Sequence, residues 1–415
     1  MANCTMKEFF KVTDLETVLG WTSLFQPVEK ETVSLTNALG RILGTDIQSE
    51  INLPDFPRAS MDGYAVKATS TFGASEGNPA YLNIVGTVAM GENPTLSIKQ
   101  GETAKISTGG MLPGGADSVV MIEHTDVIDD TTIEVYRSVA PGQHMIQIGE
   151  DIRVSQTILF QGQKLRPQEI GILAALGIET VSVYRQPVIS IISTGDEVLP
   201  ISETPTLGKI RDINSFTLSG QVTQAGGLPI QMGIVKDDFQ TLRDMCQAAI
   251  QRSDMVFVSG GSSVGIRDFT IEVLSAIPDA EILAHGISLS PGKPTILAKA
   301  GNTLFWGLPG HVTSAMVVFH VVVRPFLEHI GGKNPAHENT RSCYARLKRN
   351  LSSKQGRVDY IRVKLHHEEG ALSAEPVLGK SGLIHTMAKA DGLVRIDKNT
   401  EGLNKGTTVK VTLLI

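Results

Sequence analysis

The chain is poor in cysteine, and the few cysteines it has are scattered. Cys4, Cys246 and Cys343 lie too far apart for the short Cys–Cys or Cys–His spacing of a zinc site. An odd number of distant cysteines also gives no disulfide framework and is typical of a reducing compartment. We therefore expect a cytoplasmic protein without disulfide bonds or structural zinc.

Basic runs and long apolar runs are missing as well. The net charge is -6 and Lys and Arg do not cluster, whereas binding to a nucleic-acid backbone needs a concentrated positive face. The most apolar helical segment, 314–326, is too short to span a bilayer and contains His320, Arg324 and Pro325. The N-terminus is polar and does not resemble a secretory signal. We expect neither nucleic acid nor membrane as a partner.

Three common catalytic signatures are also absent or incomplete. The segment from Gly286 to Lys293 is one residue too long for a P-loop and is followed by Pro294 in place of Ser or Thr. No G-x-G-x-x-G follows an apolar run. Residues 261–265 (GSSVG) fit G-x-S-x-G, but the histidines indicate no catalytic triad, since His366 and His367 would face opposite ways on a strand. These absences disfavour a P-loop NTPase, a NAD enzyme and a serine hydrolase.

The length of 415 residues predicts several domains, and the residue pattern changes along the chain. Apolar spacing predicts helices over 12–19, 33–43 and 168–176, so that 1–50 and 155–184 form one discontinuous domain. Short β-like runs separated by Gly and Pro indicate a β-rich domain over 51–154 and a small barrel or sandwich over 334–415. Those runs are 81–88, 104–107, 118–122 and 132–136 in the first, and 344–347, 360–365, 393–396 and 407–414 in the second.

Residues 185–333 alternate between strand and helix patterns. Strands are predicted over 188–193, 229–235 and 255–258, with helices over 213–224 and after Asp237 or Asp238, either of which can cap the helix. This alternation predicts a parallel α/β sheet, in which ligands bind at the carboxyl ends of the strands.

Four polar segments follow the apolar runs of this region, and we expect them to converge. They are 193–197 (STGDE), 236–238 (KDD), 259–268 (SGGSSVGIRD) and 289–294 (LSPGKP). Glycine-rich bends present backbone N–H groups to anions, and carboxylates beside a phosphate are typical ligands of Mg²⁺. The pattern therefore indicates a site for a phosphorylated molecule, with Mg²⁺.

Each of these segments also has a simpler interpretation. The loop 259–268 alone is compatible with a tight turn, and Asp237 alone is better explained as a helix cap. Glu197 could be a solvated loop acid and Lys293 a surface turn residue. Only their occurrence at successive strand ends favours a site.

A second set of polar turns lies in the β-rich domain. Asp62 follows Ser60-Met61, Thr108 precedes Gly109-Gly110, and Asp151 ends a Gly-Glu-Asp triplet. In isolation each is better explained as a turn.

Seven motifs occur in order from about residue 10 to the end of the chain. They are SMDGYAV from Ser60, STG from Ser107, GED from Gly149, STGDE from Ser193, VSGGSSVG from Val258, PGKP from Pro291 and GLPGH from Gly307. In this order they resemble the molybdopterin molybdenumtransferase family, which includes the C-terminal domain of gephyrin.

The resemblance implies a fold and an activity. The fold would comprise a central three-layer α/β/α molybdopterin-binding domain, a β-rich second domain, a helical discontinuous N-terminal dimerisation domain and a small C-terminal β-barrel. The activity would be Mg²⁺-dependent insertion of molybdate into adenylylated molybdopterin, with release of AMP, by a homodimer. A molybdopterin adenylyltransferase would supply the substrate.

The resemblance also assigns residues to the site. Asp62, Thr108 and Asp151 would lie across the dimer cleft, while Glu197, Asp237 and Asp268 would bind the metal or the adenylate. Lys293 and Pro309 would border the molybdate region, and Ser381 would approach from the last domain. The remaining pterin-binding positions are Thr194, Gly195, Ser259, Gly260, Gly261, Ser262, Gly265, Pro291 and Gly292.

Three positions depart from the family's pattern. Ser290 replaces a common Lys, Ile146 a common Arg and Val312 a common Pro. The loss of two positive charges leaves three interpretations. Arg267, His285 or His311 compensates, or the protein prefers another oxyanion such as tungstate, or it has weak insertion activity. A non-catalytic pterin-binding scaffold and a nucleotide pyrophosphatase remain as rivals.

Overall fold

The computed structural model describes residues 12–260, 264–337, 342–368 and 370–414, without the side chains of 264–268. The chain divides into two compact units. The first comprises the described parts of 1–45, 161–171 and 179–415, and the second comprises 46–160 and 172–178. The residue boundaries of the four domains stay predictions.

The first unit is built on a six-stranded sheet in the order β16-β13-β17-β21-β20-β18. The strands are β13 Val188–Thr194, β16 Leu228–Val235, β17 Met255–Gly260, β18 Ala280–His285, β20 Ile296–Ala300 and β21 Thr303–Pro309. The first four in the sheet are parallel, as predicted, and β20 runs antiparallel to both of its neighbours. The parallel strands are nearly continuous apolar runs because helices cover both of their faces.

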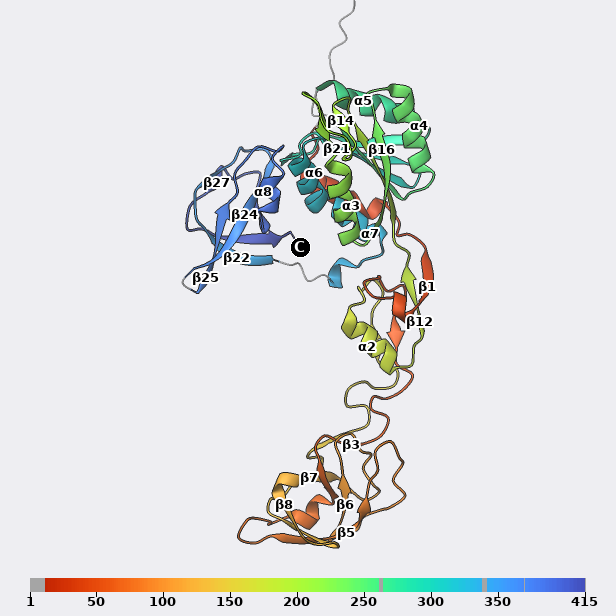
Figure 1. Ribbon diagram of the computed structural model, residues 1–415, viewed down its shortest axis with the longest axis vertical. Helices are drawn as coiled ribbons and strands as arrows, with labels where there is room; N and C mark the ends of the chain where they lie inside the picture. The colour runs from red at the N-terminus through yellow and green to blue at the C-terminus, as the bar shows by residue number, and fades with distance from the viewer. Residues whose placement is uncertain (1–11, 261–263, 338–341, 369, 415) are drawn as a thin grey trace, which may run out of the picture. The chain divides into compact units, whose positions relative to one another are not determined.

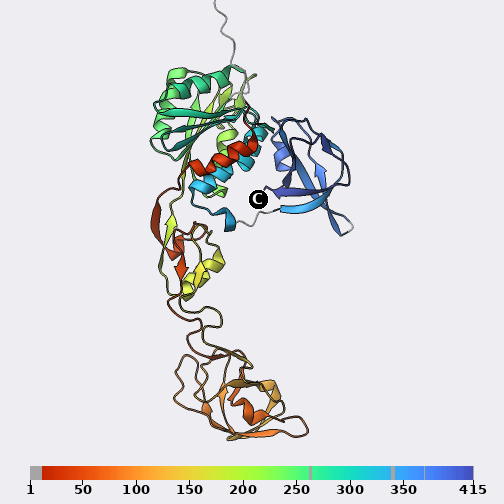
Figure 2. The same cartoon turned by 180° about the vertical axis from the view of Figure 1, so that it is seen from behind.

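Helices lie on the two faces of this sheet (Figure 1). On one face, α1 Leu15–Gly20, α3 Asn214–Gln224, α6 Val312–Val318, a π-helical segment Phe319–Val323 and α7 Arg324–Ile330 pack on Phe257 and Trp306. On the other face, α4 Phe239–Ile250 and α5 Val264–Ser275 pack on Val256 and Phe305. This confirms the three-layer α/β/α arrangement, which Figure 2 shows from behind.

The structure shows which of the two neighbouring aspartates, Asp237 or Asp238, caps helix α4. Asp238 caps the helix, and its carboxylate accepts from the N–H of Thr241 at 2.8 Å. The preference for Asp237 as a helix cap is therefore wrong. Because the residue just before the first helical turn occupies the cap position, Asp237 is left at the end of β16.

The C-terminal region forms a closed barrel, which settles the choice between barrel and sandwich. Its strands are β22 Ser342–Leu347, β24 Val358–Glu368, β25 Ala371–Pro376, β26 Gly392–Ile396 and β28 Thr408–Leu413. The ring closes because the long strand β24 pairs with both β25 and β26. Small and branched side chains fill the interior, among them Ala345, Val363 and Val411. Short elements complete the region: β23 Leu351–Ser352, β27 Gly402–Leu403 and α8 His385–Ala388.

One predicted helix is wrong. Residues 33–43 form the end of β1 Lys30–Ser34, a 3-10 turn Leu35–Asn37 and a bend at Gly40 with φ +78°. The β1 strand pairs antiparallel with β12 Thr180–Tyr184, placing Val33 opposite Val181. This pairing across the sequence, between β-branched residues, outweighs the local helical spacing. The helix predicted over 168–176 is confirmed as α2 Pro167–Ala175.

The second unit has a sheet of its own in the order β7-β4-β6-β5-β9-β8. The strands are β4 Gly63–Val66, β5 Ala80–Thr87, β6 Glu102–Ile106, β7 Ser118–Met121, β8 Thr125–Asp129 and β9 Thr132–Val135. Two separate apolar clusters, one around Ala104 and one around Val120, pack against it. The β-rich character predicted for this region is confirmed.

Several two- and three-residue strands lie outside these sheets: β2 Ile47–Gln48, β3 Arg58–Ala59, β10 Met145–Ile146, β11 Thr157–Leu159, β14 Val198–Leu199 and β15 Ile210–Arg211. Within the described ranges, no helix combines the length and the apolar character needed to cross a bilayer.

Candidate active site at the carboxyl edge of the α/β sheet

The ends of the four parallel strands align at one edge of the sheet. Thr194 at the end of β13 lies opposite Val235 of β16 and Gly260 of β17, and Gly260 lies opposite Pro309 of β21. The segments that follow these strands therefore start side by side. The convergence expected from the sequence is met by the first three polar segments.

A cluster of carboxylates occupies the β13 and β16 side of this edge. The hydroxyl of Thr194 donates to Asp237 Oδ1 at 3.2 Å, and the N–H of Asp237 donates to Asp196 Oδ1 at 3.4 Å. Partial burial raises the pKa of Asp237, and the negative charges of Asp196 and Glu197 raise it further, while the Thr194 hydrogen bond opposes them. A cation bound beside these side chains would relieve their mutual repulsion.

Two glycines allow this close packing. A Cβ on Gly195, whose φ is +142°, would lie 2.8 Å from Oε2 of Glu197. A Cβ on Gly260 would lie 2.0 Å from Cγ2 of Thr194. Glu197 therefore folds over the backbone at Gly195, and the end of β17 lies directly against the end of β13.

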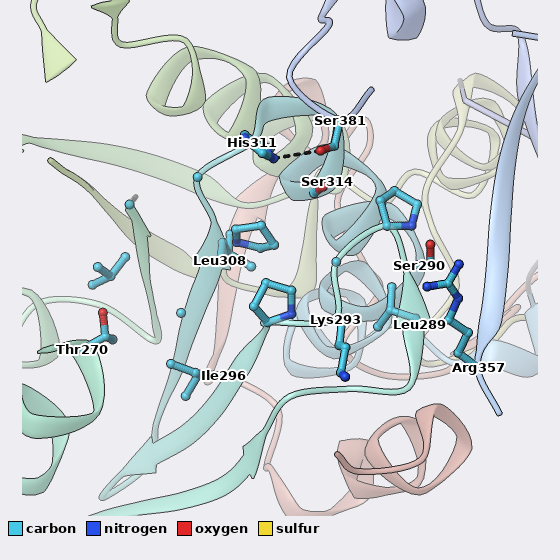
Figure 3. A pocket seen from close by; sticks show the side chains of 18 residues that line it. Thr270, Leu289, Ser290, Lys293, Ile296, Leu308, His311, Ser314, Arg357 and Ser381 are labelled. Atoms are coloured by element: carbon cyan, nitrogen blue, oxygen red, sulfur yellow. Dashed lines mark hydrogen bonds between the residues drawn. The ribbon is translucent and has the colours of Figure 1, made fainter. Parts of the chain in front are cut away.

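A cavity of about 350 Å³ adjoins this edge on its β17 and β21 side (Figure 3). Its wall consists of the ends of β17 and β21, the 289–294 loop, the starts of β20 and α6, one residue of α5 and two residues of the barrel. These residues are Val258, Gly260, Thr270, Leu289, Ser290, Pro291, Gly292, Lys293, Pro294, Ile296, Gly307, Leu308, Pro309, Gly310, His311, Ser314, Arg357 and Ser381. Its volume is within the range of small-molecule sites.

The 289–294 loop reaches the cavity by a route that the sequence did not predict. Residues Leu289–Ser290 form β19, which pairs with β24 of the barrel and does not belong to the central sheet. Lys293 thus precedes β20 and does not follow a parallel strand; it reaches the same edge because β20 is antiparallel. Gly292 has φ +117°, and a Cβ there would lie 2.2 Å from Cγ2 of Val318 on α6.

The barrel contributes Arg357 and Ser381 to the cavity wall. The hydroxyl of Ser381 is hydrogen-bonded to Nδ1 of His311 at 2.8 Å, as Figure 3 shows, and the N–H of Thr313 donates to the Ser381 carbonyl at 3.1 Å. Arg357 lines the cavity and pairs with Asp359 at 2.9 Å. These contacts place Ser381, which the family resemblance had assigned to the last domain's side of the site, in the cavity wall.

The described wall carries basic groups and no carboxylate. Lys293, Arg357 and His311 line it, together with the hydroxyls of Ser290 and Ser381. Cations and hydroxyl donors favour a tetrahedral oxyanion, although the Asp359 carboxylate, which is not part of the wall, neutralises part of the Arg357 charge. Of the three residues proposed to compensate for the missing Lys at Ser290, His311 lies in the wall. His285 is on the edge strand β18, and the Arg267 side chain is outside the described residues.

Sequence reasoning missed two residues of this edge. Arg357 follows Gly356 in a turn, and nothing in the local sequence distinguishes it from a surface residue. Asn214 begins α3, and its side-chain amide bonds to Ser259 and to the carbonyl of Gly310. A polar residue at the start of an apolar helix pattern indicates where the helix begins. The sequence therefore gave no sign that Asn214 contacts the strand ends.

Some predicted site residues lie outside the described part of the chain. These are Gly261 and Ser262, together with the side chain of Asp268; Gly265 lies in α5, described there as backbone only. Among the described side chains, no group of three or more His, Cys, Asp or Glu forms a metal site. The predicted metal set of Glu197, Asp237 and Asp268 therefore stays a prediction.

The second unit holds the other three predicted residues. Asp62 Oδ1 accepts from both the N–H and the hydroxyl of Thr108, at 2.6 and 2.9 Å. These hydrogen bonds, chiefly that from the backbone N–H, lower the pKa of Asp62. Asp151 is exposed in the loop after β10. The Asp62–Thr108 pair thus joins two motifs that are separate in the sequence.

Comparison with known protein families covers most of the chain. Residues 12–177 match the MoeA N-terminal region (domain I and II), residues 190–329 a probable molybdopterin binding domain, and residues 344–414 the MoeA C-terminal region (domain IV).

Relatives and solved structures extend the match over almost the full length. A putative molybdopterin biosynthesis protein of Methanocaldococcus jannaschii is 37% identical over 92% of both chains. The molybdopterin molybdenumtransferases of Haemophilus influenzae and Bacillus subtilis are 32% and 30% identical, over 93% of this chain and 94% and 90% of theirs. Two crystal structures of the MoeA protein of Pyrococcus horikoshii are also similar, each over 97% of this chain. One has a TM-score of 0.84 at 30% identity and is covered over 100% of its length. The other has a TM-score of 0.79 at 36% identity and is covered over 99% of its length. By sequence and by fold, this chain belongs to the molybdopterin molybdenumtransferase (MoeA) family.

Proposed function

We propose that this protein is an enzyme that inserts molybdate into adenylylated molybdopterin, releasing AMP and forming the molybdenum cofactor. The observation that carries the proposal is the cavity at the carboxyl edge of the sheet, which is basic, free of carboxylates in its described wall and adjacent to an acidic cluster. The names of the relatives that span almost the whole chain support it.

The cavity suits the oxyanion part of this reaction. Lys293 and Arg357 supply positive charge, and Ser290 and Ser381 supply hydroxyl donors around the same space. Such fixed donors and charges favour a dianion more strongly than water does, because they need no reorganisation when it binds. We assign molybdate, as substrate, to this cavity.

The acidic cluster suits Mg²⁺ on the nucleotide side. Asp237 and Glu197, with Asp268 by family resemblance, would hold the ion, because the carboxylate donors and their mutual repulsion at Asp237 fit a hard cation. When bound, Mg²⁺ supplies Lewis-acid polarisation of a phosphate oxygen. Gly260 lines the cavity and lies against Thr194, so nucleotide and oxyanion would bind side by side.

The chain's own contribution is then placement and electrostatics. Thr194 orients the Asp237 carboxylate, Gly195 lets Glu197 fold over the backbone, and Gly292 holds Lys293 at the cavity. An oxygen of water or of molybdate would attack the phosphoanhydride phosphorus as AMP leaves, so the reaction needs no nucleophilic side chain. This agrees with the absence of a Ser–His–Asp signature in the sequence.

The family resemblance adds an assembly to the proposal. Two copies would form a homodimer in the cytoplasm, so that Asp62, Thr108 and Asp151 of one copy face the α/β edge of the other. A molybdopterin adenylyltransferase would be the upstream donor. The paired Asp62 and Thr108 form a ready polar group for this role.

The test is a reconstitution with pure protein. Adenylylated molybdopterin and Mg²⁺ are incubated with molybdate, with tungstate or with neither, and AMP and metal-loaded pterin are quantified. We expect AMP and loaded pterin in equal amounts with molybdate. Tight pterin binding without AMP in any arm would instead favour a scaffold, and faster turnover with tungstate would identify that metal as the preferred substrate.

A further inference from the structure

Asn214 connects the last residues of β17 to the residue that follows β21, beside the cavity. Its Nδ2 group donates one hydrogen bond to the hydroxyl of Ser259 at 2.7 Å and another to the carbonyl of Gly310 at 2.9 Å. Ser259 precedes Gly260, and Gly310 itself lines the cavity. A single side chain thus spans neighbouring strand ends that are 45 and 96 residues away from it in the sequence.

The chemistry of the partners fixes the orientation of the amide. A carbonyl oxygen only accepts, so the NH₂ group must face Gly310, and the opposite orientation would set two oxygens against each other. Ser259 then accepts from Asn214, and its own proton points elsewhere. Oδ1 of Asn214 is buried, and no donor among the described residues reaches it. The side chain therefore acts through its two N–H groups.

The backbone around Asn214, at the start of α3, is fixed by further hydrogen bonds. Asp212 accepts from the N–H of Ser215 at 3.1 Å, and the hydroxyls of Ser215 and Ser193 are hydrogen-bonded at 2.9 Å. Asp212, Ser215 and Ser193 are all buried. The start of α3 is thereby anchored to β13. A displacement of the end of β17 or of Gly310 must therefore stretch or break a hydrogen bond to Asn214.

From this geometry we infer that Asn214 is a positioning residue that sets the spacing between the end of β17 (Ser259–Gly260) and the segment Pro309–His311 at the end of β21, and so the width of the cavity between them. The inference rests on the proposed function for its kinetic consequence. Asn214 does not line the cavity and contacts no substrate in this account; it acts through Gly260 and His311, which do line it.

The same helix offers a matched control. Gln221 on α3 also uses its side-chain amide to reach a backbone carbonyl, that of Met316 on α6 at 3.1 Å, and its Oε1 is likewise buried. Gln221 lies two turns further along α3, and Met316 is not part of the cavity wall. Replacing Gln221 removes a similar side-chain-to-backbone hydrogen bond between α3 and α6 and leaves the bonds to Ser259 and Gly310 in place.

The experiment compares Asn214→Ala, Asn214→Asp and Gln221→Ala with the wild type. Amide hydrogen exchange is followed in segments 255–260 and 305–312, and kcat and KM are measured in the reconstitution with adenylylated molybdopterin and molybdate. We expect faster exchange in both segments and a fall of roughly 10- to 100-fold in kcat for Asn214→Ala, because small displacements of a site are costly. Gln221→Ala is expected to keep wild-type kcat and KM even where its Tm falls equally.

The aspartate variant separates positioning from direct participation. Its carboxylate would face the Gly310 carbonyl, so Asn214→Asp is expected to be at least as impaired as Asn214→Ala. Wild-type kinetics in Asn214→Asp, or unchanged exchange in both segments of Asn214→Ala, would overturn the inference.

A milder variant covers the case in which the Asn214 variants do not fold. Ser259→Ala removes one of the two bonds and is expected to speed exchange in 255–260 only; unchanged exchange there would count against the inference. Exchange is measured without substrate, so a wild type that releases no AMP would refute the proposed function and leave the test of Asn214 intact.

Discussion

At the scale of single residues, the ionised carboxylate of Asp237 is needed for the proposed metal site but destabilises the folded state. Asp237 is partly buried beside Asp196 and Glu197, and its pKa is raised. A carboxyl whose pKa is higher in the folded state favours folding while it is protonated, and this contribution is lost as the pH rises through the folded pKa. At neutral pH the ionised Asp237 therefore opposes folding, as functional residues often do.

This gives a prediction for Asp237→Asn. The variant should have an equal or higher Tm than the wild type at pH 7, with the difference shrinking as the pH falls into the carboxyl range, while AMP release is lost. Thermal unfolding is measured with and without Mg²⁺. Binding to the folded state should raise the wild-type Tm and leave that of the variant nearly unchanged. A lower Tm of the variant at pH 7, or an equal response to Mg²⁺, would contradict the role given to Asp237.

At the scale of secondary-structure elements, the helix that follows the cavity contains a π-helical segment, Phe319–Val323, between α6 and α7. His320 in this segment is mostly buried, and burial lowers its pKa from 6.5 to about 4, with a further contribution from Arg324 that Glu328 opposes. In the unfolded chain His320 is protonated below about pH 6.5, whereas in the folded chain it is protonated only below about pH 4. Stability therefore falls as the pH decreases through this window.

His320→Gln should flatten that dependence. The wild type is expected to lose up to about 3 kcal/mol between pH 6.5 and pH 4 through this residue, and the variant should lose correspondingly less. Both tryptophans, Trp21 and Trp306, belong to the α/β core, so their fluorescence reports unfolding of this part of the chain. The exposed His367 on β24 provides the control, since His367→Gln should follow the wild type. Equal pH profiles for all three proteins would refute the assignment.

The elements also show which features a sequence can reveal. The buried strands β13 and β17, the edge strand β16 and the capped helix α4 were predictable because each carries its signal within a few residues. The β1 strand was not, since its pairing with β12 lies about 150 residues away. Asn214 and Arg357 were missed for the same reason: their partners are brought near only by the fold. The family motifs placed Ser381, whose contact with His311 no local pattern predicts.

At the scale of the whole molecule, the proposed homodimer makes a prediction about mixed assemblies. Asp62→Ala and Asp237→Ala should each abolish turnover. If each site combines the α/β edge of one copy with Asp62 of the other, a heterodimer of the two variants carries one site with both wild-type residues. Random mixing should then restore about a quarter of wild-type activity, because half of the dimers are mixed and half of their sites are intact.

Co-expression of differently tagged variants, followed by purification and the reconstitution assay, measures this recovery. The fraction of purified dimers that carry both tags measures how many mixed dimers have formed. No recovery in the variant mixture, with exchange demonstrated, would show that each site draws both residues from one chain.

The most direct measurement of the central claim is anomalous X-ray scattering at the molybdenum edge from crystals of this protein soaked with molybdate. The account predicts a peak in the cavity at the carboxyl edge of the sheet, within bonding distance of Lys293, Arg357 and Ser381. Peaks elsewhere only, or no peak in crystals that bind adenylylated molybdopterin, would contradict it.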